Sequence, residues 1–293
     1  MMRIALLFSM LVSLSTTSAA QVGKAAFDEG LRLMRLNKAD AAEKQFERAI
    51  AADPKNGTYH LWLGNAVGQQ TTTASTVRQP FMARRVKAEF ERALALDPEL
   101  IDARDGLIQF YLRAPGFMGG SEAKAREQQR EIAKRNAFRG HLAAANMAWA
   151  GEDTAGTERA IRAAIAVAPD SVRTVITLAQ RQAGWGRITA AFATLDEFLA
   201  RHPSDIAMRF QIGRLAAGSG QQLDRGEKLL RELIAEPEWE STNLHPSRAA
   251  VHYRLGMVLE ESGKKPDAKA AHERALALDP QLKPAKDALA ALR

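Results

Sequence analysis

The chain has 293 residues, 46% of them hydrophobic, a formal net charge of +7 and no cysteine. The missing cysteine excludes disulfide bonds, thiolate catalysis and lipid attachment at a cysteine. The positive charge permits attraction to acidic proteins or anionic polymers, but acidic and basic residues are interleaved along most of the expected helices, which favours a solvated outer face.

Residues 1–20 have the pattern of a secretory signal peptide. Arg3 supplies a positive start, residues 4–14 are mostly apolar, and small residues precede an expected cleavage after Ala20. An uncleaved membrane anchor is the alternative, but the apolar run is shorter than the roughly 20 residues that span a bilayer. We therefore expect a periplasmic or secreted protein with no transmembrane segment after cleavage.

Three expected helices end in nearly the same nine-residue segment. The copies are FERAIAADP at 46–54, FERALALDP at 90–98 and HERALALDP at 272–280. Each closes with Asp-Pro, where the proline disfavours helical geometry in the residue before it and cannot continue the hydrogen-bond ladder. Pro169, Pro203 and Pro237 also recur at intervals of 34 residues. A 34-residue recurrence of helix pairs is typical of a stacked solenoid.

With these segments the chain resembles the tetratricopeptide repeat family, whose pattern is W-x2-L-G-x2-Y, then A-x3-F, then P. The large–small pairs of the first helix are Leu63-Gly64, Leu178-Ala179, Ile212-Gly213 and Leu255-Gly256. The small position of the second helix is assigned to Ala42, Ala125, Ala190 and Ala268, and the aromatic position to Phe46 and Phe90. The departures are Ile108 in a small position, Thr194 in the aromatic position and Ala137 in place of proline.

The resemblance implies an all-α fold, a right-handed α-solenoid of stacked antiparallel helix hairpins. About seven repeats are expected over residues 23–282, with a capping helix over residues 283–293. Glycine or alanine at a crossing lets two helices approach closely, and larger apolar residues fill the grooves around it. One hairpin cannot bury enough apolar surface alone, so each is expected to depend on its neighbours.

Three insertions interrupt the repeats, near residues 69–85, 113–122 and 238–248, and insertions in such arrays often lie on a binding face. The first is interpreted either as a basic contact arm or as a longer second helix whose Phe81 and Met82 pack on the neighbouring repeat. The arm would consist of Arg78, Phe81, Arg84 and Arg85. In the second, Phe117 and Met118 either enter a partner's pocket or fold back over their own hairpin. In the third, Trp239 is either a partner contact or a lid on a groove between repeats.

The resemblance also implies a concave surface, lined by the first helices, that binds an extended or helical peptide. One polar position recurs directly after the small one, at Asn65, Gln109, Asn146, Gln180 and Arg214. Such side chains can hydrogen-bond a peptide backbone whatever its sequence. The apolar groove contacts expected beside them are Trp62, Trp149, Phe210 and Tyr253. The alternative is that these positions face solvent and merely tolerate polar residues.

No catalytic or metal-binding pattern is present in the sequence. His60, His141 and His252 occupy one repeat position, which indicates packing, and His272 stands where two other copies have phenylalanine. We expect no enzyme, no catalytic residue, no metal, no cofactor and no nucleic-acid partner. The predicted function is a protein–protein interaction scaffold of the cell envelope that binds a protein or peptide in its groove. The alternative is a basic envelope protein that associates with a polymer or lipid through the arm at residues 78–87.

Overall fold

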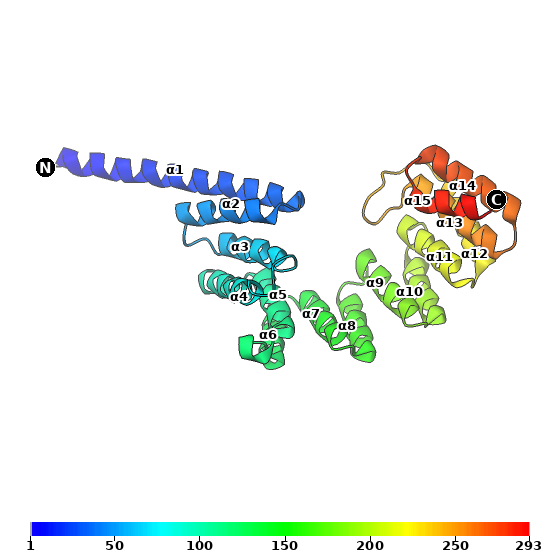
Figure 1. The fold of residues 1–293 in the computed structure, drawn as a ribbon, viewed down its shortest axis with the longest axis horizontal. Coiled ribbons are helices and arrows are strands. Elements are labelled where there is room, and N and C mark those ends of the chain that lie inside the picture. The colour runs from blue at the N-terminus through cyan, green and yellow to red at the C-terminus, as the bar shows by residue number, and fades with distance from the viewer. Residues whose placement is uncertain (1, 293) are drawn as a thin grey trace. The chain divides into compact units, whose positions relative to one another are not determined.

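The computed structural model describes residues 2–292, with side chains described from residue 19 onward. The expected leader therefore falls largely outside the described side chains, and Met1 lies outside the described residues altogether. Over residues 2–292 the chain forms fifteen α-helices, one short 3₁₀ helix and no strand, as the all-α prediction required. These helices divide into two compact units, residues 1–160 and 161–293, and the boundary falls inside α8 (Figure 1).

Unit 1 contains the helices up to the start of α8. They are α1 (Met2–Arg35), α2 (Ala39–Ala52), α3 (Gly57–Gln70), α4 (Gln79–Leu96), α5 (Ile101–Arg113), the 3₁₀ helix η1 (Gly116–Met118), α6 (Glu122–Arg135) and α7 (Ala137–Ala150). Consecutive helices pack on one another, with α1 against α2, α3 against α4, and α5 against α6. Each pair forms a helix hairpin, and the connections of the second and third pairs contain the first two insertions.

Unit 2 contains the rest of α8 and the following seven helices. They are α8 (Thr154–Val167), α9 (Val172–Gly184), α10 (Ile188–Arg201), α11 (Ile206–Ser219), α12 (Leu223–Ala235), α13 (Arg248–Glu261), α14 (Lys265–Leu278) and α15 (Lys283–Ala291). Here α9 packs against α10, α11 against α12, and α13 against α14, while α15 covers α14.

Helix ends follow the sequence signals closely. The helices α2, α4 and α14 end immediately before the Asp-Pro of each nine-residue copy. At Ala137, where the repeat pattern expects proline, one helix passes almost directly into the next. Asn136 alone separates α6 from α7, and its side chain accepts a hydrogen bond from the backbone N–H of Arg139 at 2.9 Å. This N-cap replaces the proline as the signal that ends one helix and starts another.

The small positions of the first helices receive large side chains from the second helices. A Cβ atom built on Gly64 would lie 2.8 Å from the ring of Phe90, and one on Gly213 would lie 2.5 Å from Leu230. Because no real Cβ fits at such distances, glycine is required for the close approach. The sequence-based interpretation of these positions is therefore confirmed.

In the α9–α10 hairpin the predicted register is wrong by one residue. Ala190 and Thr194 were assigned to the small and aromatic positions, but Ala191 and Leu195 are the residues buried there, at 0% and 1% exposure. The Thr194 hydroxyl instead donates to the side-chain oxygen of Gln182 at 2.8 Å. The proline signal gives the correct register, since Pro203 follows Leu195 by eight residues, as Pro54 follows Phe46.

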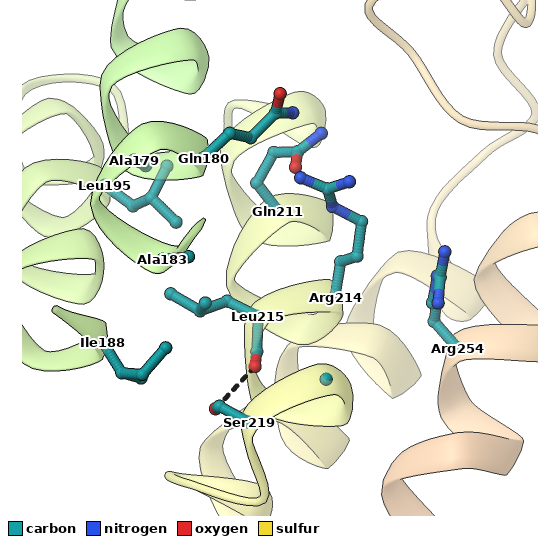
Figure 2. A pocket seen from close by; sticks show the side chains of 11 residues that line it. Ala179, Gln180, Ala183, Ile188, Leu195, Gln211, Arg214, Leu215, Ser219 and Arg254 are labelled. Carbon is teal, nitrogen blue, oxygen red and sulfur yellow. Dashed lines mark hydrogen bonds between the residues drawn. The ribbon is translucent and has the colours of Figure 1, made fainter. Parts of the chain in front are cut away.

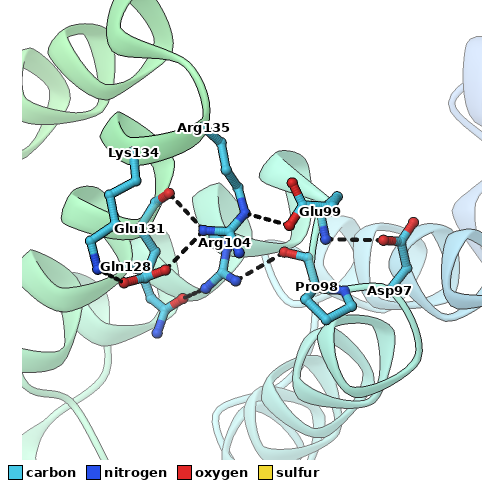
Figure 3. Close-up of polar contacts among 8 residues, drawn as sticks. All are labelled: Asp97, Pro98, Glu99, Arg104, Gln128, Glu131, Lys134 and Arg135. Carbon is cyan, nitrogen blue, oxygen red and sulfur yellow. Dashed lines mark hydrogen bonds and ion pairs between the residues drawn. The ribbon is translucent and has the colours of Figure 1, made fainter.

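Buried arginines join the start of a first helix to the segments around it. Arg104 in α5 donates from Nη1 to Gln128 in α6 and from Nη2 to the carbonyl of Pro98, both at 2.9 Å (Figure 3). Arg209 in α11 does the same in unit 2, with Glu236 at 2.9 Å and the carbonyl of Ser204 at 3.0 Å. Because charge-assisted hydrogen bonds are among the stronger ones, these arginines fix each hairpin to the turn that precedes it.

His272 occupies the aromatic position of the last hairpin, as the sequence comparison predicted. Its ring is fully buried against Gly256, and Nε2 lies 2.5 Å from a carboxylate oxygen of Glu260. The other ring nitrogen, Nδ1, has no hydrogen-bond partner in the described part of the chain. A buried polar atom without a partner destabilises the folded state.

We therefore expect His272→Phe to raise the free energy of unfolding by about 1 kcal/mol. Phenylalanine removes the unpaired nitrogen and matches the packing of Phe46, while the Glu260 side chain, 31% exposed, stays in contact with water. Urea denaturation followed by circular dichroism measures the change. A loss of stability would mean that the bond to Glu260 outweighs the unpaired nitrogen.

Candidate functional site

The polar positions predicted for the groove meet in pairs, one pair in each unit. In unit 1, Asn65 of α3 and Gln109 of α5 line one cavity. In unit 2, Gln180 of α9 and Arg214 of α11 line another. The first helices of successive hairpins therefore bring equivalent positions to one surface, which is the arrangement that the resemblance implied. Asn146 of α7 is exposed and lines neither of these two cavities.

The cavity of unit 2 has a volume of about 320 Å³, and we call it the basic cavity. Its polar side is formed by Gln180, Gln211, Arg214 and Arg254, which come from three successive first helices. Figure 2 shows the amides of Gln180 and Gln211 beside the guanidinium of Arg214, with Arg254 opposite on α13. Its apolar side is formed by alanine and leucine or isoleucine side chains of α9, α10 and α11. The cavity thus offers hydrogen-bond donors above an apolar wall.

The electrostatics of the basic cavity favour an anion. Partial burial lowers the pKa of Arg214, and the positive charge of Arg254 lowers it further. The Arg254 guanidinium has only uncharged partners in the described structure, the sulfur of Met257 at 3.0 Å and the ring of Tyr253 at 5.0 Å. No lining residue is acidic. An incoming carboxylate would relieve the repulsion between the two arginines and form charge-assisted hydrogen bonds.

The cavity of unit 1 is larger, about 610 Å³, and is bounded by α3, α4, α5 and the segments inserted around them. We call it the insert cavity. Its floor includes Val86, Phe90 and Phe110, and Asn65 and Gln109 lie among its polar lining residues. Arg113 is the only charged residue among those that line it.

Two of the predicted aromatic contacts belong in part to the core. Trp62 is half-buried, and its ring centroid lies 6.5 Å from that of Phe27 and 6.2 Å from that of Phe46. Phe210 packs against the apolar core of unit 2. Both side chains therefore stabilise their hairpins as well as reaching the surface.

The remaining two aromatic contacts differ in how accessible they are. Tyr253 is half-buried beside the ring of His272, at 5.6 Å between centroids, and beside Arg254. Trp149 of α7 is 45% exposed.

The predicted contact arm is only partly free. Residues 79–87 belong to α4, and Met82 packs against the core of unit 1, as the interpretation of a longer second helix required. Arg85 is bound by two carboxylates of α2, those of Glu43 and Glu47. Arg78 and Arg84 remain exposed, and Phe81 is 68% exposed. The segment therefore combines both interpretations, with one face packed and the other open.

The two apolar residues of the second insertion have different environments. Phe117, in η1, is 89% exposed, so the expectation that it folds back over its hairpin is wrong. Met118 does turn inward and lines the insert cavity. Gly119, with a φ of +97°, follows directly and allows the chain to reverse there.

In the third insertion Trp239 is a lid rather than a free contact. Its indole N–H donates to the carbonyl of Pro246 at 2.8 Å, and the guanidinium of Arg248 lies 4.3 Å from its ring centroid. The side chain also packs against the core of unit 2.

In the part of the chain that the structure describes, no group of three or more histidine, aspartate or glutamate side chains is placed to hold a metal ion. In the same residues, no helix combines the length and the apolar character needed to cross a bilayer.

Sequence reasoning missed three lining residues, Gln211, Arg254 and Arg113. Gln211 and Arg254 each stand two residues before the glycine of a small position, Gly213 and Gly256. That repeated offset is a signal that alignment of the hairpins could have revealed. Arg113 ends α5 next to the second insertion, and no repeat position predicts its direction.

The fold and the repeated positions define a helical repeat protein built from packed hairpins. The tetratricopeptide repeat profile matches residues 27–70 in unit 1 and 210–283 in unit 2, so both units contain tetratricopeptide repeats. No curated protein sequence gives a significant match.

Two solved structures share the fold at low sequence identity. A tetratricopeptide repeat protein from Parabacteroides merdae is 15% identical with a TM-score of 0.50, and the match covers 93% of this chain and 99% of that one. Yeast Tom70 is 12% identical with a TM-score of 0.57, and the match covers 95% of this chain and 61% of Tom70. At these identities the likeness describes the fold alone.

Proposed function

We propose that the protein is a non-catalytic scaffold that binds segments of partner proteins on its first helices. The observation that carries this proposal is the meeting of equivalent polar positions in open cavities, Asn65 with Gln109 and Gln180 with Arg214. Side-chain amides supply donors and acceptors that match a peptide backbone. A position in the cell envelope, periplasmic or secreted, rests on the signal-peptide pattern of residues 1–20.

In unit 2 the partner segment carries a carboxylate. Two arginines and two glutamines converge on the basic cavity, and no acidic side chain there competes for them. Hydrogen bonds from guanidinium groups to carboxylates are short, directional and stronger than neutral ones. The carboxylate is supplied by an acidic side chain or by the end of a chain, and the apolar wall of the cavity contacts the neighbouring residue of the partner.

The test uses fluorescein-labelled peptides rich in aspartate and glutamate, with matched peptides that carry asparagine and glutamine. Fluorescence anisotropy measures their affinity for the full chain. The double variant Arg214→Ala/Arg254→Ala is expected to bind the acidic peptides at least about tenfold more weakly, since the lost hydrogen bonds involve charged groups. The neutral peptides should bind weakly to both proteins.

A matched control removes the same two charges elsewhere. Arg78→Ala/Arg84→Ala changes two exposed arginines of unit 1 and should leave the affinity unchanged. If this control loses binding while the cavity variant does not, and binding falls steeply with salt, the protein acts instead through the arm at residues 78–87. That outcome would favour the polymer- or lipid-associated alternative.

A further inference from the structure

Two insertions that lie about 40 residues apart in the sequence form the walls of one cavity. Thr76, Gln79 and Pro80 of the first insertion line the insert cavity, and so do Arg113, Pro115 and Met118 around the second. These segments interrupt the 34-residue repeat at both places. The insert cavity therefore combines the groove positions Asn65 and Gln109 with walls that the insertions, and not the repeat itself, provide.

A glycine in the lining of the insert cavity leaves space for a ligand group. Gly68 of α3 lines the insert cavity, and a Cβ atom placed on it would meet only Val86, at 3.8 Å. Phe90, Phe110 and Met118 provide apolar surface around this space. A cavity of about 610 Å³ with such a lining is in the range that takes a ligand group. A bulky apolar side chain suits the cavity better than a polar one.

The polar lining favours a peptide over the acyl chain of a lipid. The side-chain amides of Asn65 and Gln109 both reach the cavity, and neither has a hydrogen-bond partner among residues 19–292. A peptide backbone can pair with these donors and acceptors. An acyl chain would cover them without pairing them, which is unfavourable.

The charge of the lining selects among peptides. Arg113 is exposed and forms no ion pair within the described structure, and the residues that line the insert cavity include no aspartate or glutamate. Phe117, exposed and next to Met118, offers a further apolar contact just outside. A partner segment with an acidic residue beside its apolar one complements this surface.

We propose that the insert cavity binds a bulky apolar side chain of a partner peptide in which an acidic residue stands next to it. This inference rests on the proposed function, that the protein binds segments of other proteins. It adds a second site, in unit 1, with a different preference from the basic cavity of unit 2.

The experiment selects a phage-displayed library of random peptides on the full chain and measures the selected peptides by fluorescence anisotropy. We expect one class with phenylalanine, tryptophan or leucine beside aspartate or glutamate. Gly68→Leu fills the insert cavity and should lower the affinity of the protein for this class of peptides at least tenfold. Gly184→Leu, whose Cβ meets no atom within 4 Å and which lines neither cavity, is the control and should change nothing. Arg113→Gln should weaken these peptides but not versions with the acidic residue replaced by alanine.

A fourth variant separates failure of the inference from failure of the proposed function. Gly218 lines the basic cavity, and its Cβ also meets no atom within 4 Å, so Gly218→Leu fills the other site. If Gly218→Leu lowers the affinity for every selected peptide and Gly68→Leu lowers it for none, the insert cavity is not a peptide site. The proposed scaffold function still stands in that case. If neither variant matters, both proposals fail. Binding of a fluorescent long-chain fatty acid that Gly68→Leu abolishes, with no peptide selected for this site, would replace the peptide by a lipid.

Discussion

Replacing Phe90 by alanine is expected to lower the free energy of unfolding by about 3–5 kcal/mol, the usual range for removal of a buried aromatic side chain. The ring is 4% exposed and lies between two glycines from different hairpins. Cβ atoms on Gly64 and Gly106 would lie 2.8 Å and 2.5 Å from opposite edges of the ring. Phe90 therefore joins its own first helix to the first helix of the next hairpin, and its loss loosens both contacts.

Urea denaturation of the full chain, followed by circular dichroism, measures this effect. Phe117→Ala provides the comparison, because that ring is 89% exposed and its removal should change stability by no more than about 0.5 kcal/mol. Similar values for the two variants would show that Phe90 does not hold the hairpins together.

Much of the fold is predictable because the repeats need close helix contacts at fixed intervals. Asp-Pro ends α2, α4 and α14 for a local reason, the steric effect of proline on the residue before it. The pairing of Gly64 with Phe90 is less local but recurs with the period, so several copies support it. The number of repeats, the leader and the cellular address stay predictions.

Where one copy differs from the others, the pattern alone gives the wrong register. In α10 the chain has Ala190-Ala191 and Thr194-Leu195, so both the small and the large position have two candidates one residue apart. In the structure, packing decides between them, because Thr194 finds Gln182 as a hydrogen-bond partner and Leu195 enters the core. The spacing to Pro203 contains the same information and is the more reliable guide.

The candidate site is predictable in its residues but not in its shape. The recurring polar position identified Asn65, Gln109, Gln180 and Arg214 from the sequence. That the two insertions enclose one cavity depends on where α4 begins and how the chain turns at η1, which no repeat position specifies. Of the two interpretations of the second insertion, folding back holds for Met118, which lines the insert cavity, but not for Phe117, which is exposed.

Gly64 and Gly68 lie one turn apart on α3, and the same substitution should have opposite effects at the two positions. Gly64→Leu is expected to lower the free energy of unfolding by at least the 1–3 kcal/mol or so of a typical overpacking substitution. The Phe90 ring, 2.8 Å from the new Cβ, cannot retreat because Gly106 lies against its other edge. A Cβ atom on Gly68 would lie 3.8 Å from its nearest neighbour, Val86. Gly68→Leu is therefore expected to raise the free energy of unfolding by up to about 1 kcal/mol, because leucine has the higher helix propensity.

Both variants are measured by urea denaturation beside the wild type. The comparison keeps the helix, the residue type and the added volume constant, so a difference in stability reports only what each Cβ meets. Equal losses of stability at the two positions would mean that α3 tolerates no added side chain on this face. Glycine would then be needed at position 68 for helix packing, and the open cavity beside it would be contradicted. A neutral Gly68→Leu beside a destabilised Gly64→Leu separates the two roles of glycine in this helix, since one glycine admits the ring of its own hairpin and the other leaves space for a partner.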